Sequence, residues 1–358
     1  MENLAKLDQI KGQRVLVTGH TGFKGSWFSS MLILLGADVY GISLPPEKDS
    51  LFEILNSLDE TKSFYLDIRD KNALQKKIDE IKPQLVVHLA AQSLVLKSYE
   101  SPFETFEVNF MGTLNLLEIL RTQEIVSGVL VITTDKVYAT NDRELAFVEG
   151  DPFGGKDPYS SSKAAVEIML EAYRNLSWKN SNVKIVSARA GNVIGGGDRS
   201  ENRLFPDLVR ALESGSVLQV RNPDHVRPWQ HVLEPLFAYL LVLLRMLEGG
   251  KLSNAYNFGP NKNQVLKVDE VLSVCSTIFP NLQIKVQSAQ GENSSLHESN
   301  FLKLDSSLAQ NELNWKPVYN TEMAIRKTLE WEIAKLNGEL GKAKTIEQIL
   351  EFIKTFNA

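Results

Sequence analysis

The sequence predicts an α/β protein: a Rossmann-type, doubly wound parallel sheet with a smaller, mixed C-terminal lobe. Strand-like and helix-like segments alternate through the first half of the chain, the order that builds a parallel sheet from βαβ units. An apolar strand near the N-terminus runs into a glycine-rich turn, as in sheets that bind dinucleotides. Beyond residue 190 the alternation breaks into shorter pieces, which indicates the lobe.

Composition limits the classes of function. The 358 residues are enough for one large or two modest domains with a sizeable core. A net charge of −5 with scattered lysines and arginines argues against nucleic acid as a partner. Residues 1–12 lack the apolar core of a signal peptide, and no run approaches the roughly 20 apolar residues of a membrane span. We therefore expect a cytoplasmic protein without a membrane partner.

The only cysteine, Cys275, excludes an internal disulfide framework and a cysteine-rich metal site. We expect it to be a core side chain of a helix over Val268–Ile278. His20 and His231 have no second histidine or carboxylate at a metal-like spacing, and His88 lies within a strand pattern. We expect no metal site, a structural or ligand-lining role for His20 and His231, and a structural role for His88.

Six strands are expected in the first part of the chain, each an apolar or β-branched run bounded by turn residues. They are Arg14–Thr18, Asp38–Leu44, Lys62–Ile68, Leu85–Ala90, Val129–Thr133 and Val183–Arg189. Helical patterns separate most of them, so their carboxyl ends should lie along one edge of the sheet, where such sheets bind ligands.

Later elements are shorter. The patterns predict helices or strands at Arg203–Glu213, Val217–Val220, Leu236–Met246, Ala255–Phe258, Val268–Ile278, Thr321–Ile333 and Lys344–Phe356. We expect a dinucleotide-binding domain at residues 1–190 with a return near 229–260. The lobe would take residues 191–228 and 261–340, and a C-terminal helix residues 341–358.

Three glycines follow the first strand directly. Gly19, Gly22 and Gly25 are spaced three apart, and an amphipathic segment over Gly22–Leu35 comes after them. Glycines here allow a tight turn and close approach of the backbone to a pyrophosphate, and the helix N-terminus supplies N–H donors. The alternative is a purely structural glycine-rich turn.

A second motif pairs a phenol with an ammonium group. Tyr159 and Lys163 stand four residues apart at the start of an expected helix, so they share one face. A nearby ammonium favours the phenolate, which could take a proton from an alcohol. The alternative is an exposed helix pair.

A third motif follows the strand Val129–Thr133. Thr134, Asp135 and Lys136 should reach the same sheet edge as Tyr159, where they could bind a hydroxyl, exchange a proton and act as a base. The alternative is a strand-end turn with solvated charges, but the combination with Tyr159 and Lys163 favours a catalytic site.

Taken together, these motifs resemble the extended short-chain dehydrogenase/reductase superfamily. Gly19-x-x-Gly22-x-x-Gly25, Leu89-Ala90-Ala91-Gln92, Thr134-Asp135-Lys136 and Tyr159-x-x-x-Lys163 stand in its order and approximate spacing. Within it the chain is most similar to nucleotide-sugar dehydratases of the CDP-glucose 4,6-dehydratase type, through the longer strings Gly19–Trp27, Ala190–Asp198 and Arg227–Val232. The resemblance covers nearly the whole chain.

The resemblance implies a hydro-lyase of deoxysugar biosynthesis, as in the O-antigen of lipopolysaccharide, with an NAD that is reduced and reoxidised in each turnover. Tyr159 would deprotonate the C4 hydroxyl, with Lys163 lowering its pKa and Thr134 orienting the oxygen. Asp135 would protonate the departing C6 hydroxyl. Lys136, where dTDP-glucose and GDP-mannose dehydratases carry Glu, would be the C5 base if burial beside Lys163 keeps it neutral.

Two binding sets are carried over with the resemblance. The NAD contacts would be Gly19, Thr21, Gly22, Phe23, Lys24, Gly25, Asp67, Ile68, Leu89, Ala90, Ala91, Thr133, Tyr159 and Lys163. The sugar nucleotide would be held by Gln92, Ser93, Asn192, Arg203, Arg227 and His231, with the arginines as bidentate pyrophosphate clamps.

Cofactor choice is open from the residues alone. Pro45 and Pro46 stand where an acidic residue often holds the adenosine ribose, and no arginine cluster suits a 2′-phosphate. NAD therefore rests on the resemblance. Asp67 either contacts the adenine with Ile68 or caps the following helix.

The substrate also stays open, because Ser93, Leu96, Lys97 and Arg199 depart from the pattern of the CDP-glucose enzymes. UDP-N-acetylglucosamine or dTDP-glucose is the next candidate substrate, followed by a 4-epimerase and then by a non-catalytic NAD-binding regulator. The helices Phe103–Leu120 and Ser160–Tyr173 are the expected interface of a homodimer, or of a higher homo-oligomer.

Overall fold

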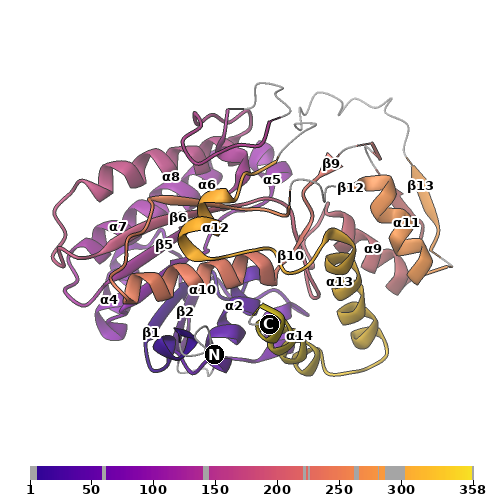
Figure 1. Ribbon diagram of the computed structural model, residues 1–358, viewed down its shortest axis with the longest axis horizontal. Coiled ribbons are helices and arrows are strands. Elements are labelled where there is room, and N and C mark those ends of the chain that lie inside the picture. The colour runs from indigo at the N-terminus through magenta and orange to yellow at the C-terminus, as the bar shows by residue number, and fades with distance from the viewer. Residues whose placement is uncertain are drawn as a thin grey trace.

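The computed structural model describes residues 6–58, 62–139, 145–220, 223–224, 226–261, 266–280, 282–286 and 303–356, and of residues 226–227 the backbone alone. Its centre is a parallel sheet of seven strands in the order β11-β6-β5-β4-β1-β2-β3 (Figure 1). The strands are β1 (Arg14–Thr18), β2 (Asp38–Ser43), β3 (Ser63–Tyr65), β4 (Leu85–His88), β5 (Gly128–Ile132), β6 (Lys184–Ala190) and β11 (Ala255–Phe258). The predicted Rossmann-type fold is confirmed.

The winding direction of the sheet changes between β1 and β4. The chain runs outward from β1 through β2 to β3, then returns to pair β4 with β1 and continues to β5 and β6 on the other side. Thr18 at the end of β1 is level with His88 at the end of β4. The loops after these two strands therefore separate at the carboxyl edge, where doubly wound sheets bind ligands.

Helices cover both faces of the sheet. One face carries α2 (Phe23–Leu34) and α10 (Leu233–Leu247), whose apolar side chains form one core with alternate residues of the strands. The other face carries α4 (Lys71–Ile81), α7 (Thr113–Arg121) and α8 (Pro158–Arg174), which bury the remaining strand residues. Because both faces are covered, the strands read as continuous apolar runs.

The C-terminal lobe lies beside the carboxyl edge of the sheet (Figure 1). Its core joins α9 (Leu204–Ser214), α11 (Val268–Ile278) and α13 (Thr321–Leu336), and it includes the buried Cys275 as predicted. Short strand pairs complete the lobe: β7 (Val193–Ile194) with β10 (Gln230–His231), β8 (Leu218–Val220) with β13 (Ile284–Val286), and β9 (Val226–Arg227) with β12 (Leu266–Lys267).

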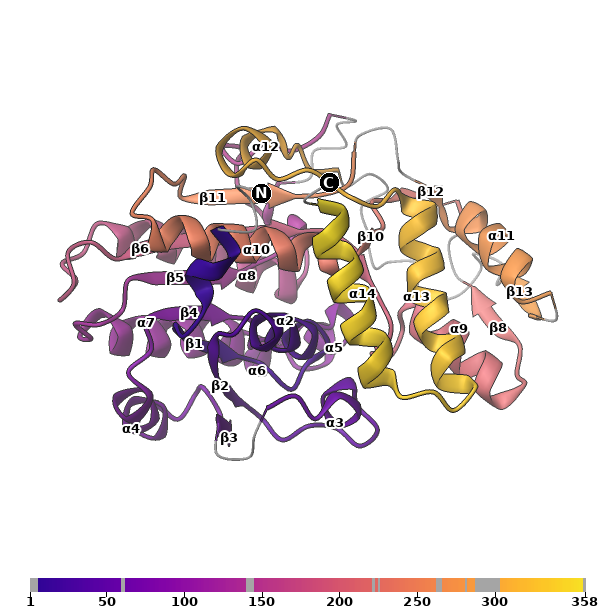
Figure 2. The same ribbon diagram turned by 60° about the horizontal axis from the view of Figure 1, so that its bottom comes forward.

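The C-terminal helix α14 (Gly341–Phe356) lies between the lobe and the sheet, against α2 on one side and α13 on the other (Figure 2). The remaining elements are η1 (Asp8–Ile10), α3 (Leu51–Leu55), α5 (Val95–Glu100), α6 (Pro102–Phe106), the π-helical η3 (Glu107–Gly112), η4 (Asp135–Val137) and α12 (Ser307–Leu313). Across the described ranges, no helix is both long and apolar enough to cross a membrane.

Two predicted elements differ from the structure. The third strand stops at Tyr65 instead of Ile68, because the chain leaves the sheet edge in a turn at Asp67. The single helix expected over Phe103–Leu120 is α6 and α7 joined by the π-helical η3, where Gly112 lies so close to Ile68 that an added Cβ would come within 2.5 Å of its Cδ1 atom.

Candidate active site

The glycine-rich loop joins β1 to α2 at the centre of the carboxyl edge. Gly19 has φ +76°, a conformation that side chains disfavour, and an added Cβ would come within 2.6 Å of the Ala90 nitrogen. A Cβ at Gly25 would come within 2.1 Å of the Gly19 oxygen, whereas at Gly22 the nearest atom lies at 3.4 Å. The loop therefore folds tightly against residues Leu89–Ala91 after β4 and stays open at Gly22, the N-cap of α2. This cradle fits a pyrophosphate.

The residues around this cradle have defined partners. Thr21 shares a hydrogen bond with the Ser43 hydroxyl at 2.7 Å and donates to the Leu44 carbonyl at 3.1 Å. Phe23 is half-buried beside Gly195 of the lobe, where an added Cβ would lie 3.2 Å from its ring. Ser43 ends β2 and Leu44 follows it, so neither residue supplies the carboxylate that often binds the adenosine ribose at this position.

Lys24 follows the glycine loop, in the first turn of α2. Burial and the nearby positive charge of Arg203 lower its pKa to about 8, while the charge of Asp135 acts in the opposite direction.

Asp67 and Ile68 lie at the outer end of the dinucleotide side. The Arg69 guanidinium binds the Asp67 carboxylate at 2.7 Å and holds its pKa below the usual range. The alternative that Asp67 caps the next helix is wrong, because Asp70 caps α4 through the Ala73 nitrogen. Ile68 is buried.

The end of β5 and the start of α8 bring the expected catalytic residues together. Thr134 donates to the Asp135 carboxylate at 3.0 Å, caps η4 through the Lys136 nitrogen and is hydrogen-bonded to Tyr159. Asp135 is 2% exposed and lies against Gly191, where an added Cβ would come within 2.7 Å of Oδ2. Lys136 follows on the same turn and is half-buried.

Helix α8 begins with a cap that fixes the catalytic phenol. The Asp157 carboxylate accepts from the Ser160 nitrogen at 2.9 Å, and Pro158 occupies the first turn, where it needs no hydrogen-bond partner. Tyr159 and Lys163 are both buried on the face of this helix that meets β5.

In the chain by itself, Lys163 is not among the groups that lower the pKa of the phenol, and that role stays a prediction for the cofactor-bound protein. Burial raises the pKa of Tyr159 to about 12, and the hydrogen bond with Thr134 and the charge of Arg203 offset only part of this. Lys163 donates to the Ile132 carbonyl at 3.0 Å, and its own burial lowers its pKa to about 8. Tyr159 thus needs further positive charge to act as a base near neutral pH.

Three of the expected substrate residues lie around this centre. Arg203 starts α9, binds Asp198 at 3.2 Å, and lowers the pKa of Tyr159. Ser93 is exposed after β4, and Asn192 is half-buried after β6. For Arg227, the backbone lies in β9 and the side chain is outside the described residues.

The structure disagrees with the predicted contact between the Gln92 side chain and the substrate. Its side-chain amide donates to the Leu94 carbonyl and the Thr105 hydroxyl, both at 3.0 Å, and accepts from the Leu94 nitrogen at 2.7 Å. The amide is therefore occupied in holding its own loop, and the predicted substrate contact is wrong for this side chain.

The structure also disagrees with two other predicted contacts, that of His231 with the substrate and that of the Thr133 hydroxyl with the cofactor. His231 is fully buried between the rings of Trp27 and Tyr319, and burial lowers its pKa to about 3, so it is a core group rather than a substrate ligand. The Thr133 hydroxyl donates to Glu167 at 2.5 Å and is therefore engaged within the protein.

The other histidines are held by the protein. His88 binds the hydroxyls of Thr18 at 2.7 Å and Thr113 at 2.8 Å, so its predicted structural role is confirmed. His20 binds the Ser63 hydroxyl at 2.7 Å. Over the residues with described placement, no group of three or more His, Cys, Asp and Glu residues could hold a metal ion.

Asn109 was missed by the sequence argument. Its amide oxygen accepts from the Gln92 nitrogen at 2.8 Å, and its amide nitrogen donates to the Ser162 hydroxyl at 2.9 Å. It therefore ties the loop after β4 to the residue before Lys163. The one signal was a polar residue within an apolar helix pattern, and the π-helical turn that carries Asn109 is common at functional sites.

Comparison with known proteins matches this geometry. The profile of the family described as GDP-mannose 4,6 dehydratase covers residues 16–328. The chain belongs to this family. A CDP-glucose 4,6-dehydratase of Salmonella typhimurium is 42% identical over 336 residues, which cover 92% of this chain and 93% of the relative. A dTDP-glucose 4,6-dehydratase of Shigella flexneri is 27% identical over 352 residues, covering 90% and 94%.

The fold of this GDP-mannose 4,6 dehydratase family member also recurs among solved structures. The UDP-glucose 4-epimerase of Thermus thermophilus, solved as a complex with NAD, superposes with a TM-score of 0.73 at 27% identity. The match covers 89% of this chain and 98% of the epimerase.

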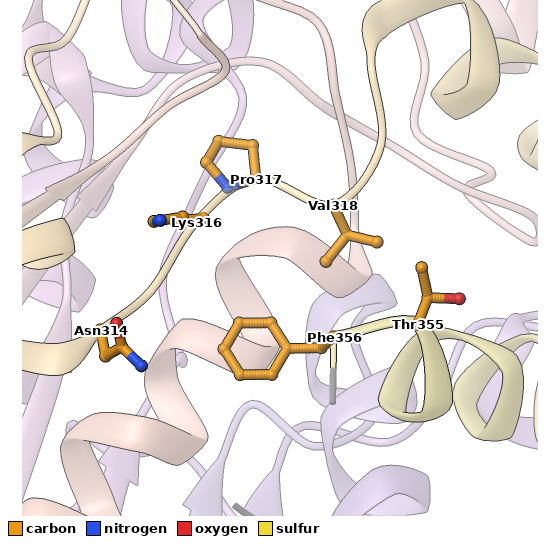
Figure 3. A pocket seen from close by; sticks show the side chains of 6 residues that line it. All are labelled: Asn314, Lys316, Pro317, Val318, Thr355 and Phe356. Carbon is orange, nitrogen blue, oxygen red and sulfur yellow. The ribbon is translucent and has the colours of Figure 1, made fainter. Parts of the chain in front are cut away.

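Two hollows of this family member lie apart from the catalytic edge. One, of about 310 Å³, lies between the segment after α12 and the end of α14 (Figure 3) and is lined by Asn314, Lys316, Pro317, Val318, Thr355 and Phe356. The other, of about 420 Å³, lies at the opposite end of β6, beside Arg174 and Trp178. Neither contains a residue of the predicted site.

Proposed function

We propose that this protein dehydrates CDP-glucose to CDP-4-keto-6-deoxy-glucose, as an NAD-dependent hydro-lyase of deoxysugar biosynthesis. The observation that carries the proposal is the 42% identity to a CDP-glucose 4,6-dehydratase across nearly the whole of both chains. The glycine cradle, in which an added Cβ at Gly19 or Gly25 would collide with backbone atoms of Ala90 or Gly19, fits the dinucleotide. NAD in the related epimerase supports the same cofactor here.

In the first step, Tyr159 takes the proton of the C4 hydroxyl and Thr134 orients the oxygen by hydrogen bonding. NAD, when bound, accepts the C4 hydride and later returns it to C6, so no net oxidation results. Lys163, which is held by the Ile132 carbonyl, supplies positive charge beside the nicotinamide ribose.

In the second step, the 4-keto group acidifies the C5 proton. Lys136, in its neutral form, removes that proton, and Asp135 protonates the departing C6 hydroxyl, so that water is lost across C5 and C6. When hydride returns to C6, Lys136 gives the proton back to C5. Asp135 suits the acid role because it is almost fully buried next to Thr134. The adjacent Gly191 leaves space beside its carboxylate.

The test is incubation with CDP-glucose and NAD, followed by alkali, in which 4-keto-6-deoxy sugars develop ultraviolet absorbance. We expect this signal with CDP-glucose and much less with dTDP-glucose or UDP-N-acetylglucosamine. A signal from another sugar nucleotide in place of CDP-glucose would move the substrate assignment, and conversion to a 4-epimer would replace the reaction.

One departure from the CDP-glucose pattern has a structural explanation that supports this substrate. Arg199 is bound by Glu332 at 3.3 Å and by Glu213 at 3.4 Å, both on helices of the lobe. Its side chain is therefore engaged within the protein, so the change at this position does not argue against CDP-glucose. The other departures from the pattern, at Ser93, Leu96 and Lys97, are the positions whose effect on the choice of sugar nucleotide should be tested.

We further propose a cytoplasmic homodimer formed through α6, η3, α7 and α8. Large apolar side chains are exposed on these elements, among them Phe103 at 75% and Ile168 at 62%. Such a patch marks an interaction surface, and a symmetric dimer would cover it. Sedimentation equilibrium of the wild-type protein tests the stoichiometry.

We propose that the chain is divided into one part that binds the dinucleotide and another that covers the sugar nucleotide. Residues 1–190, with a return near 229–260, hold the dinucleotide, and residues 191–228 and 261–340 cover the sugar nucleotide. The placement of β11 in the main sheet supports the return. Limited proteolysis with and without NAD tests these boundaries.

A further inference from the structure

An ion pair lies directly behind the catalytic edge. Arg189 on β6 binds Glu167 on α8 through two parallel contacts, from Nε to Oε1 at 2.8 Å and from Nη2 to Oε2 at 2.9 Å. The two side chains are 3% and 1% exposed. A pair this deep persists only when its remaining hydrogen-bonding groups are also satisfied.

The pair binds both ends of the catalytic turn. Thr133, immediately before the turn Thr134–Val137, donates to Glu167 at 2.5 Å. Tyr138, immediately after it, accepts from Arg189 Nη1 at 2.7 Å. The four residues that include the acid Asp135 and the base Lys136 are therefore bracketed by two anchors on one rigid pair.

The pair is itself fixed to the central strands. Ser187 on β6 donates to Glu167 at 2.7 Å, and the Tyr138 hydroxyl donates to the amide oxygen of Asn257 on β11 at 2.7 Å. The Tyr138 ring stacks on Phe147, with centroids 4.8 Å apart. These contacts transmit the position of β6 and β11 to the catalytic turn.

We propose that the Glu167–Arg189 pair, acting through Thr133 and Tyr138, positions Asp135 and Lys136 for the loss of water. This inference rests on the proposed dehydration. Tyr159 is held separately, by the start of α8 and its Asp157 cap. The elimination step uses two residues of the anchored turn, Asp135 and Lys136, whereas the oxidation at C4 uses only Thr134 from it. Loosening one anchor therefore slows the elimination more than the oxidation.

The variant Tyr138→Phe removes one hydroxyl and keeps the stacked ring, so the fold should survive. Misplacement of a catalytic group by about 1 Å can cost on the order of a hundredfold in rate. We expect the rise of reduced-nicotinamide absorbance in a single turnover to slow by no more than a few fold, through Thr134, and its later fall to slow by about tenfold or more. Solvent deuterium should enter C5 correspondingly slowly.

The matched control is Tyr256→Phe. Tyr256, on β11, is a buried tyrosine like Tyr138, but its hydroxyl accepts from the Ser253 nitrogen at 2.8 Å and donates to Glu312 at 2.6 Å instead of bonding to the pair. Its substitution should leave both phases unchanged. Thr133→Val, which removes the other anchor, should repeat the effect of Tyr138→Phe and replaces it if thermal unfolding shows that Tyr138→Phe is not folded.

Equal slowing of both phases, or no change in either anchor variant, would overturn the positioning role. The rates of the two phases are measured with whichever sugar nucleotide the wild type dehydrates, so an error in the CDP-glucose assignment does not affect the comparison. A wild-type protein that dehydrates none would overturn the proposed function as well.

Discussion

Gly22 and Gly25 are glycines for different reasons, although they belong to one motif. An added Cβ at Gly25 would meet backbone atoms, the Gly19 oxygen at 2.1 Å and the His20 Cα at 2.7 Å. At Gly22 the backbone has an ordinary φ of −76°, and the nearest atom to an added Cβ is 3.4 Å away. The folded chain therefore requires glycine at 25, whereas at 22 we expect the requirement to come from the proposed dinucleotide.

We expect Gly25→Ala to lower the free energy of unfolding by about 1–3 kcal/mol, the usual cost of overpacking. Gly22→Ala should change it by less than about 1 kcal/mol, since only an N-cap preference is lost, but should weaken NAD binding. Urea unfolding and isothermal titration with NAD measure the two effects. If both alanines destabilised the fold equally, the separation of roles would be wrong.

The identity of a reactive residue was predictable, but the direction of its side chain was not. Thr134, Asp135 and Tyr159 meet because strand ends and helix starts share one edge of a parallel sheet. Gln92 follows β4 and His231 is the last residue of β10, yet the amide is bound by its own loop and the ring is buried among aromatic rings. Those outcomes depend on distant partners that spacing does not encode.

At the scale of elements, periodicity placed most helices and strands within a few residues of their observed ends, because apolar faces repeat along each one. It failed at the break in Phe103–Leu120, since a π-helical turn has no distinct periodicity and here accompanies the contact of Gly112 with Ile68. Two helix starts carry a local signal that the sequence argument did not use. Asp157 and Asp70 cap α8 and α4 in the same way.

These two caps form a matched pair, one at the active site and one remote from it. We expect Asp157→Ala and Asp70→Ala each to lower the free energy of unfolding by about 1 kcal/mol, the usual value of a lost N-cap. Only Asp157→Ala should also reduce turnover, because it loosens the turn that carries Tyr159. Urea unfolding and steady-state kinetics test this, and equal turnover losses in both variants would contradict it.

For the whole molecule, the central sheet could be predicted, but the docking of the C-terminal segment could not. The connection is made by Glu234 on α10, which accepts from the backbone nitrogens of Val318 at 3.0 Å and Tyr319 at 2.6 Å. A glutamate within an apolar helix signals a buried partner, yet these partners lie more than eighty residues away in the sequence. Contacts at that separation leave no local pattern.

Glu234 should also give the stability of the molecule a pH dependence. Burial raises its pKa from 4.5 to about 8, and the two backbone N–H groups offset only part of this. The folded protein therefore keeps a proton that the unfolded chain has released. The contribution of this group to stability is full below pH 4.5 and is lost as the pH rises to about 8.

The glutamine in Glu234→Gln cannot titrate. We therefore expect the free energy of unfolding of the variant minus that of the wild type to increase from about pH 5 to about pH 8 and to stay constant above that pH. The lost carboxylate oxygen adds only a constant offset, since the amide oxygen can still accept from Tyr319. Urea unfolding across this range measures the difference, with the exposed Glu201→Gln as control. A difference that is flat, or that falls with rising pH, would show that Glu234 is ionised in the folded protein and that its backbone donors outweigh burial.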